Sequence, residues 1–307
     1  MRIDEILAKK GDQGEPVFSF EFFPPRTPEG VEGLWGALEV LGELAPDYVS
    51  VTYGAGGATR DGTVEISSRI KNELGLETMS HVSCVGETAE GLESVLRRIE
   101  SAGIENLLAL RGDPPRGEAE FAAPEGGLHS AAELAAFAAE RFDFAIGGSC
   151  FPEVHPEAPG LEADLAYLRT KVDAGASFLI SQLFFDNGVY FDWLAEARRT
   201  GIEVPIIPGI MPITSYSQIR RFCTLCEATI PAPLAAAMES LGGDAEAEQE
   251  LGIAYAARQC EELLAAGAPG LHIYTLNKAP ATRAILGALR VARPWDRAPS
   301  TLGAAAD

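Results

Sequence analysis

Residues 19–26 read Ser-Phe-Glu-Phe-Phe-Pro-Pro-Arg, an aromatic run that carries one carboxylate and stops at two prolines. Successive side chains of a strand point to opposite faces, so Ser19 and Glu21 share one face and the phenylalanines at 20 and 22 the other. Proline cannot donate to a strand ladder, so the chain leaves the sheet just past the acid. Glu21 is therefore held on a rigid strand with little water to stabilise its charge. This makes it a candidate proton donor at neutral pH, although a solvated glutamate on an edge strand also fits the motif taken alone.

Apolar runs of this kind recur along the chain, with amphipathic stretches between them. They are residues 17–20, 48–52, 78–83, 106–110, 142–147, 178–182, 205–210 and 270–275. Strict alternation of strand and helix predicts parallel strands joined by right-handed crossovers. Eight such units fit a closed (β/α)8 TIM barrel, and we expect one barrel domain over residues 1–307. A doubly wound open sheet is the second possibility, but no G-x-G-x-x-G fingerprint follows any of the runs.

Composition excludes several classes of partner. The 307 residues carry a net charge of −21, so phosphates are repelled and binding to nucleic acid or an anionic membrane is disfavoured. No apolar run reaches the roughly eighteen residues that a membrane-spanning helix needs. Acidic Asp4 and Glu5 follow Met1 where a signal peptide needs basic and then apolar residues. We therefore expect a cytoplasmic protein that binds small molecules.

Common catalytic devices are missing from the sequence. Cys223 and Cys226 form a CxxC spacing, but no second pair completes a metal site, and five cysteines do not suggest a disulfide framework. The four histidines, His81, His129, His155 and His272, show no HxH or HExxH spacing, so we expect no metal. No lysine lies on the sixth run for a Schiff base, and no G-x-S-x-G elbow occurs. The remaining set of acids, amides and aromatic rings suits a planar cofactor that supplies electrons while the protein handles a proton.

Polar side chains gather where the predicted strands end, which is where barrel active sites form. These strand-end residues are Glu21, Thr52, Tyr53, His81, Arg111, Gly112, Asp113, Phe151, His155, Gln182, Tyr274 and Lys278. Solvation alone does not readily explain such convergence from separate strands. We therefore predict a functional rim at the carboxyl end of the barrel.

Two helical spacings sharpen this prediction. Asp164, Tyr167 and Lys171 share one helix face, which suits a ribose hydroxyl and a phosphate, although an exposed ion-pair stripe has the same spacing. Gln218 and Phe222 lie at i and i+4 on a later helix, for which Thr214 or Ser215 is a plausible N-cap. An amide beside a ring suits a flat heterocycle, while packing of the ring in the core is the alternative.

Eight segments together resemble the 5,10-methylenetetrahydrofolate reductase family, in its bacterial single-domain type. They are SFEFFPPR from Ser19, VSVTYG from Val49, ALRGDP from Ala109, PEVHPE from Pro152, KVDAGA from Lys171, QLFF from Gln182, IIPGIMP from Ile206 and YTLNK from Tyr274. The resemblance implies a barrel with FAD at its mouth. It further implies ping-pong chemistry, in which NAD(P)H reduces the flavin and leaves. Methylenetetrahydrofolate then takes its place, and its one-carbon bridge is reduced to the methyl group that serves methionine synthesis.

The resemblance also implies residue roles. Glu21 matches the general acid that protonates the leaving nitrogen, and Asp113 matches a carboxylate that stabilises the iminium cation and lies beside both flavin and pterin. The flavin-contact positions are Thr52, Tyr53, Ala55, His81, Arg111, Gly112, Asp113, Ala131, Phe151, His155, Ala158, Asp164, Tyr167 and Lys171. The substrate positions are Glu21, Asp113, Gln182, Gln218 and Phe222, with Lys278 near the folate's glutamate tail.

Some positions depart from the family pattern. Ser130 and Phe151 stand where relatives often carry Tyr, and Tyr167 and Thr170 replace more polar or basic residues beside the flavin phosphates. These departures bear on how tightly FAD is held. The resemblance implies a homo-oligomer and no C-terminal regulatory domain of the kind that eukaryotic relatives carry.

Two other functions compete with a flavin-dependent reductase. A pterin-dependent methyltransferase on the same barrel would bind a methylated pterin without flavin, and could use residues 111–113 with Gln182. A catalytically silent folate-binding subunit is the third possibility, and the retained Glu21 counts against it. Either NADH or NADPH could serve as the nicotinamide donor of the reductase.

Overall fold

Strand β1 (Val17–Phe22) pairs in parallel with β2 (Tyr48–Val51) on one side and with β9 (Gly270–Tyr274) on the other. The first and last strands of the chain are thus neighbours in one sheet. The computed structural model describes residues 1–53, 57–114 and 121–297, and for residues 57–60 it describes the backbone alone.

The ring closes at the seventh predicted strand. β7 (Ile206–Ile207) pairs with β6 (Ala176–Ser181), and β8 (Gly209–Ile210) pairs with β9. Pro208 separates these two short strands because it has no N–H to donate, yet its carbonyl still accepts from the His272 amide at 3.0 Å. β7 and β8 are therefore two halves of one barrel strand, and the predicted closed (β/α)8 barrel is confirmed.

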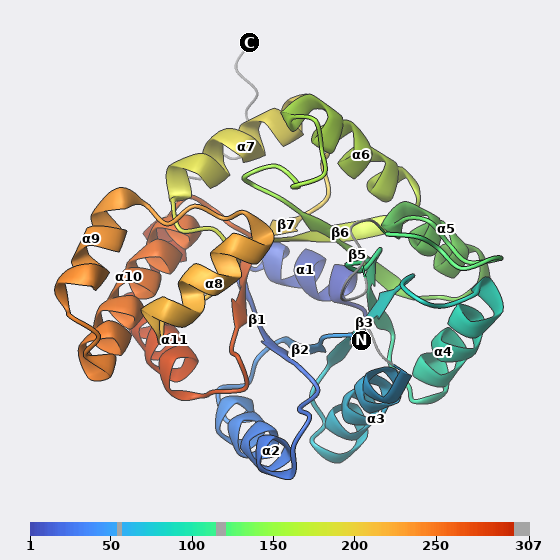
Figure 1. Ribbon diagram of the computed structural model, residues 1–307, viewed down its shortest axis with the longest axis horizontal. Helices are drawn as coiled ribbons and strands as arrows, with labels where there is room; N and C mark the ends of the chain where they lie inside the picture. Colours follow the sequence, from blue (N-terminus) through green and yellow to red (C-terminus); the bar gives the residue numbers. More distant parts are fainter. Residues whose placement is uncertain (54–56, 115–120, 298–307) are drawn as a thin grey trace.

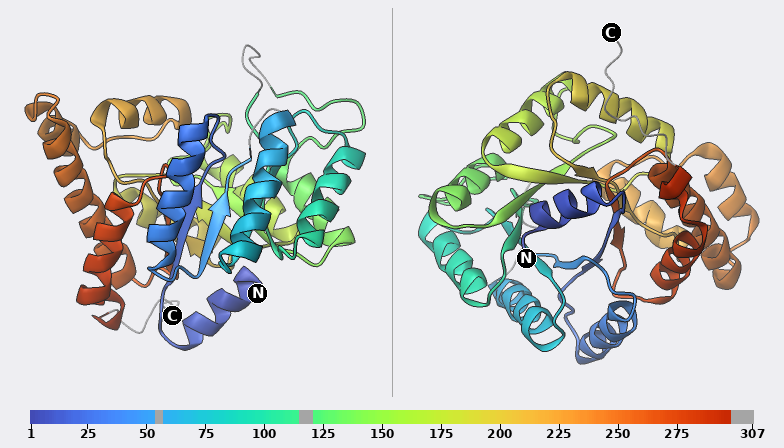
Figure 2. Two further views of the ribbon diagram at one scale, coloured as in Figure 1. Left: turned by 90° about the horizontal axis from the view of Figure 1, so that it is seen from below. Right: turned by 180° about the vertical axis from the view of Figure 1, so that it is seen from behind.

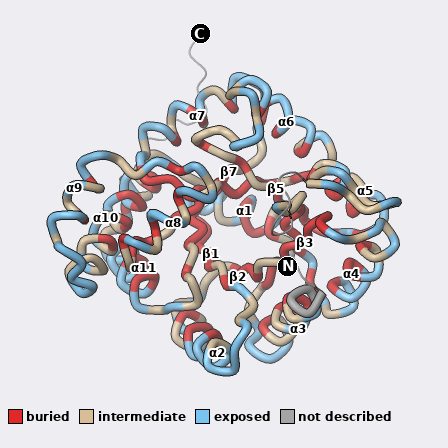
Figure 3. Tube along the Cα trace, in the orientation of Figure 1, coloured by how far each residue is buried: buried red, intermediate tan, exposed pale blue. Residues whose placement is uncertain are grey.

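The other strands stand between these in chain order, inside a ring of helices (Figure 1). They are β3 (Thr78–Ser83), β4 (Asn106–Leu110) and β5 (Ala145–Cys150). The helices that follow the strands are α2 (Pro28–Gly42), α3 (Gly57–Glu73), α4 (Ala89–Ser101), α5 (Ala131–Arg141), α6 (Leu161–Asp173), α7 (Asn187–Arg199), α8 (Tyr216–Cys226), α9 (Ala232–Ser240), α10 (Ala245–Ala265) and α11 (Pro280–Ala292), and a 3-10 turn (Pro294–Arg297) comes last. Their buried sides face the strands and their exposed sides face outward (Figure 3).

Helix α4 illustrates why these segments are helical. Its apolar residues Leu92, Val95, Leu96 and Ile99 recur at helical spacing and are buried against the sheet. Thr88 caps the first turn, since its side chain accepts from the Gly91 amide at 3.1 Å. Among the described helices, none is long and apolar enough to cross a membrane.

The fifth strand begins three residues later than the apolar run at 142–147 suggests. Phe142 instead ends α5, and its ring stacks on Phe144 with centroids 5.4 Å apart on the outer side of the barrel. The aromatic pair therefore serves packing between sheet and helices before the strand starts.

Helix α1 (Ile3–Asp12) closes the amino-terminal end of the barrel and was not foreseen from the sequence (Figure 2). Its buried residues Ile3, Ile6 and Leu7 cover the inward-pointing side chains at that end. Those are Val17, Tyr48, Met79, Leu108, Ala145, Phe178, Ile180 and Ile207. The described side chains thus pack the lumen at this end, and the polar strand ends lie at the opposite mouth.

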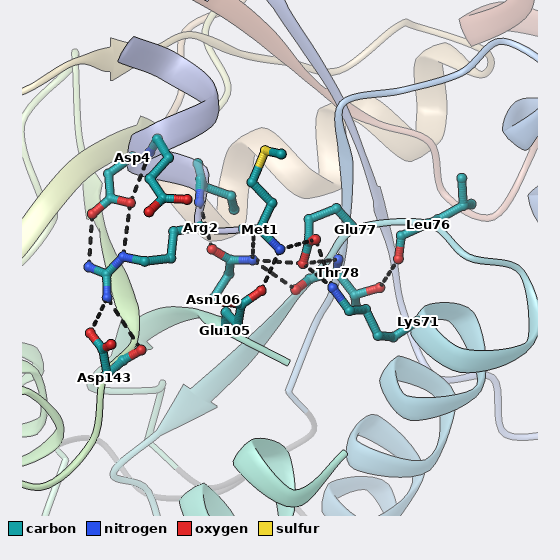
Figure 4. Close-up of polar contacts among 12 residues, drawn as sticks. Met1, Arg2, Asp4, Lys71, Leu76, Glu77, Thr78, Glu105, Asn106 and Asp143 are labelled. Atoms are coloured by element: carbon teal, nitrogen blue, oxygen red, sulfur yellow. Dashed lines mark hydrogen bonds and ion pairs between the residues drawn. The ribbon is translucent and has the colours of Figure 1, made fainter. Parts of the chain in front are cut away.

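A polar network around Asn106 anchors α1 (Figure 4). The fully buried Asn106 amide accepts from the Ile3 N–H at 2.7 Å and donates to Glu77 at 3.0 Å. The ammonium group of Met1 lies 2.6 Å from Glu77 and also pairs with Glu105. Arg2 adds an ion pair with Asp143.

Replacing Asn106 by Ala should lower the free energy of unfolding by about 1–3 kcal/mol, because it leaves the Ile3 N–H buried without its acceptor. Chemical denaturation of both proteins measures this difference. Asn72→Ala is the matched control, since exposed Asn72 bonds to the Ala102 carbonyl at 3.0 Å where water can replace it. Equal losses in the two variants would contradict the anchoring role.

Candidate active site

The carboxyl end of the lumen holds a buried polar cluster beneath the barrel mouth. Ser19 and Glu21 both point inward, as strand alternation predicts, and the pairing of β1 with β9 sets Ser19 opposite His272. His272 is fully buried; its Nδ1 lies 2.7 Å from Ser19 Oγ and its Nε2 lies 3.3 Å from Glu21 Oε2. Ser50 Oγ from β2 lies 3.4 Å from the same Nε2. The Glu21 side chain is 17% exposed and so faces both this cluster and the mouth.

The cluster can satisfy its hydrogen bonds with Glu21 in either protonation state. When Glu21 is ionised, His272 Nε2–H donates to it and Ser19 O–H donates to Nδ1. When Glu21 is protonated, its own O–H donates to Nε2, and Nδ1–H donates to Ser19. The serine hydroxyl then turns to the Leu271 carbonyl, 3.3 Å away. Neither state leaves a member of the chain unpaired, which suits an acid that must release a proton and regain it.

A second imidazole flanks Glu21 from β3. His81 Nε2 lies 3.5 Å from Glu21 Oε2 but makes no hydrogen bond, although the atom is buried. Burial lowers the pKa of His81 to about 4, against the opposing effect of the Glu21 carboxylate, so its ring is neutral at physiological pH. A buried nitrogen without a hydrogen-bond partner, beside the candidate acid, is a polar group that a bound molecule could satisfy.

Neighbouring groups keep the mouth rigid. Tyr274 donates to the Ser181 carbonyl at 2.7 Å, and burial keeps its pKa well above the ordinary value, so it is a neutral phenol. The Glu21 carbonyl accepts from Thr275 Oγ1 at 2.6 Å. Both contacts fix the end of β9 relative to its neighbours.

The loop after β4 carries the predicted Arg-Gly-Asp segment. Gly112 has φ +88°, and a Cβ there would lie 3.0 Å from Val85, so the backbone turn requires glycine. Both terminal nitrogens of Arg111 donate to the Glu157 carboxylate, one of them at 2.7 Å. This pairing raises the pKa of Arg111. Its guanidinium also lies 5.2 Å from the centroid of the Phe121 ring. Asp113 is exposed at the rim.

Asp164 and Lys171 are both buried, so the alternative of an exposed ion-pair stripe on α6 is wrong. Asp164 accepts from the His155 amide at 3.2 Å, and burial raises its pKa. Lys171 Nζ donates to the Ser149 carbonyl at 2.8 Å and lies 5.0 Å from the centroid of the Tyr167 ring. Burial lowers the Lys171 pKa to about 8. A buried amine with further N–H groups to donate suits an anionic ligand.

The other predicted flavin positions lie around this same rim. Phe151 and His155 form an edge-to-face pair with centroids 4.6 Å apart, and Ala158 donates its N–H to the His155 carbonyl at 2.8 Å. Ala131 is buried at the start of α5, where Ser130 serves as N-cap. Thr52 and Tyr53 follow β2, and Tyr53 packs partly against the outer core. Ala55 lies outside the described residues.

The remaining predicted substrate positions lie after β6, next to the end of β5, and on α8. Gln182 follows β6, and its amide oxygen accepts from the Leu183 N–H at 2.9 Å. On α8, Gln218 and Phe222 are half-buried, and the Phe222 ring packs against the cluster that contains Leu183 and Ile219. Core packing therefore explains the buried part of the Phe222 ring, and the rest of the ring remains accessible.

The start of α8 matches the predicted N-cap position at Ser215 but not the expected side-chain contact. Ser215 occupies the N-cap position, but its side chain accepts no helix N–H, and Glu248 of α10 instead accepts from the Tyr216 amide at 2.8 Å. The cap is thus supplied by another helix.

Lys278 borders a cavity of about 330 Å³ beside the mouth. The cavity is lined by residues that include Gly33, Thr214, Gln249, Tyr274, Lys278 and Thr282. Tyr274 lines this cavity and also bonds to β6 through the Ser181 carbonyl, so the cavity lies next to the carboxyl end of the lumen.

The residues missed by sequence reasoning are Ser19, Ser50 and His272 as partners of the acid. The inward side of β1 already indicated Ser19, but the pairing with His272 crosses 253 residues of sequence.

No group of three or more His, Cys, Asp or Glu side chains in the described part of the chain is arranged to hold a metal ion. Cys223 and Cys226 are free thiols, and burial raises the pKa of Cys223 to about 12.

Together these features define a class of protein, a TIM barrel that holds a hydrogen-bonded serine, histidine and glutamate beneath its mouth and carries Arg111 and buried Lys171 at its rim. A family model, Methylenetetrahydrofolate reductase, matches residues 3–290. The chain is 40% identical over 279 residues to "5,10-methylenetetrahydrofolate reductase" of Escherichia coli (strain K12), covering 91% of this chain and 92% of that protein. The chain belongs to the methylenetetrahydrofolate reductase family.

Two further proteins are similar to this chain, one in sequence and one in fold. The chain is 41% identical to "Methylenetetrahydrofolate reductase (NADH) 1" of Arabidopsis thaliana, covering 90% of this chain and 49% of that protein. It thus spans about half the length of the plant relatives. An uncharacterized protein from Clostridium thermocellum that binds two copies of 5-methyl-5,6,7,8-tetrahydrofolic acid has the same fold. Its TM-score is 0.64 at 17% identity, with 94% of this chain and 99% of that chain covered.

The depressed pKa of His81 predicts a pH-dependent stability. In the unfolded chain His81 binds a proton below about pH 6.5, whereas in the folded protein it binds one only below about pH 4. The free energy of unfolding therefore falls as the pH falls from about 6.5 to about 4. Between pH 7.5 and 4.5 the parent protein should lose about 2–3 kcal/mol more unfolding free energy than His81→Gln.

Urea denaturation at the two pH values measures this loss. His129→Gln, which replaces an exposed histidine, is the matched control. An identical pH dependence in the parent and in His81→Gln would show that His81 is not buried as a neutral ring.

Proposed function

We propose that the protein reduces 5,10-methylenetetrahydrofolate to 5-methyltetrahydrofolate, with FAD as bound cofactor and NAD(P)H as electron donor in a ping-pong cycle. The observation that carries this proposal is the cluster in which His272 and Ser19 support Glu21 in both protonation states. Reductive opening of the folate's one-carbon bridge needs a proton at a nitrogen, and Glu21 is the acid that faces the mouth from this cluster. The family relationship supports the choice of folate.

The rim fits a flavin in its donor chemistry. Lys171 and Arg111 would hold phosphate oxygens, Asp164 would hold a ribose hydroxyl, and the unpaired Nε2 of His81, beside Glu21, would pair with a polar atom of the flavin ring. Bound FAD supplies hydride transfer from the nicotinamide to the one-carbon unit. In a chain of net charge −21, these local cations offset a broadly repulsive field for an anionic cofactor.

The protein's own groups handle protons, charge and orientation. Glu21 donates a proton to the leaving nitrogen of the bridging ring, and His272 with its proton on Nε2 donates a hydrogen bond to the resulting carboxylate. Exposed Asp113 offsets the positive charge of the iminium cation that ring opening creates. Gln182, Gln218 and Phe222 orient the flat ring of the folate or of the nicotinamide, which share the site. Lys278, beside its cavity, binds the folate's carboxylate tail.

Anaerobic spectroscopy tests the function directly. The purified protein should bind FAD and turn yellow, bleach when NADH or NADPH is added, and regain colour when methylenetetrahydrofolate follows. A colourless protein that takes up no flavin in equilibrium dialysis but binds a methylated pterin would instead support the methyltransferase.

Glu21→Gln separates the two half-reactions. Hydride transfer from the nicotinamide needs no acid from the protein, so flavin content and the rate of bleaching should stay close to those of the parent. Folate reduction should slow by at least ~10²-fold, the low end for loss of a general acid. Stopped-flow absorbance measures both rates.

Glu196→Gln, on the exposed face of α7, is the control for replacing a carboxylate. If Glu21→Gln reduces folate at the parent rate, Glu21 is not the proton donor.

A further inference from the structure

The loop between β5 and α6, residues 151–160, is tied to three different elements. Its His155 amide donates to Asp164 on α6, and its Glu157 pairs with Arg111 after β4. The third tie is Glu153, whose two carboxylate oxygens accept from the Thr229 amide at 3.1 and 3.0 Å. The first two ties lie within the candidate flavin site, whereas the third reaches across to the segment that follows α8.

The backbone of this loop is strained at Val154, between the two residues that bond to other elements. Val154 has φ +69°, a left-handed conformation that crowds the Cβ of a β-branched residue. Such strain persists only where the surroundings fix the backbone. Here Val154 stands between Glu153 and His155, and both of these neighbours are held by other elements.

Glu153 lies beside the last turn of α8. Its charge adds to the effect of burial in raising the pKa of Cys223 and Cys226, which form that turn. A carboxylate near the carboxyl end of a helix opposes the helix dipole, so local stability of α8 does not explain its presence. Its hydrogen bond to Thr229 connects two parts of the mouth instead.

Helix α8 is thus held from both ends by other elements. Glu248 binds the Tyr216 amide at its start, and Glu153 binds the Thr229 amide just past its end. The helix lies beside α9 and α10 (Figure 1) and carries Gln218 and Phe222, both only half-buried. Its orientation decides where these two side chains lie relative to the flavin side of the mouth.

We propose that Glu153 is a positioning residue that ties α8 to the β5–α6 loop, and so sets Gln218 and Phe222 at the binding site shared by folate and nicotinamide. The inference rests on the proposed function, because that function makes α8 a substrate helix. Glu153 touches no substrate in this account; it acts through the Thr229 backbone.

Glu153→Ala tests the proposal in the flavin-loaded enzyme. The KM values for both NAD(P)H and methylenetetrahydrofolate should rise by about fivefold or more, the lower end of typical coupling between two sites. Flavin content, the flavin spectrum, kcat and the melting temperature should stay close to the parent values. Glu153→Gln should restore both KM values, because its amide oxygen can still accept from the Thr229 N–H.

Glu196→Ala is the matched control, since it removes a carboxylate from an exposed ion pair on α7. Unchanged KM values in Glu153→Ala would overturn the proposal. So would a joint loss of flavin, kcat and melting temperature that Glu153→Gln does not restore, because that pattern marks a general structural role. A parent protein that neither binds flavin nor turns over folate would refute the proposed function itself, and this outcome is distinguishable because it appears before any variant is made.

Discussion

The pairing of β1 with β9 is the contact on which the rest of the molecule depends. It joins strands whose facing residues, such as Ser19 and His272, lie 253 positions apart in the chain. Together with the split strand at Pro208 it closes the barrel, and the same register sets Glu21 beside Tyr274 and above His272. Fold and candidate acid site therefore arise from one set of backbone hydrogen bonds.

Closure also determines the surroundings of the acid. Helix α1 fills the amino-terminal end with Ile3, Ile6 and Leu7, so the polar cluster lies between an apolar plug and the mouth. Buried polar groups are costly unless each has a partner in every state they adopt. The Ser19–His272–Glu21 chain meets this condition for both protonation states, while neutral His81 adds no second charge.

Much of this arrangement could be predicted from local patterns. Alternation along residues 17–22 predicts that Glu21 faces inward, and helical spacing brings Asp164 and Lys171 to one face. Local patterns could not reveal the partners of Glu21, because His272 reaches it only through pairing of distant strands. Helix α1 escaped prediction because its apolar side finds a partner only at the end of a closed barrel. Ser215 takes the predicted N-cap position of α8, but the sequence could not reveal that Glu248 of another helix accepts from the first N–H.

The central claim is that Glu21 delivers the proton that accompanies reduction of the one-carbon bridge. Time-resolved infrared difference spectroscopy, with glutamate side chains labelled with carbon-13, observes this transfer directly when reduced protein meets methylenetetrahydrofolate. The account predicts that the band of one protonated, labelled carboxyl disappears as the folate is reduced, and that Glu21→Gln lacks this change. A spectrum in which no labelled carboxyl loses its proton, or in which Glu21→Gln shows the same band, would contradict it.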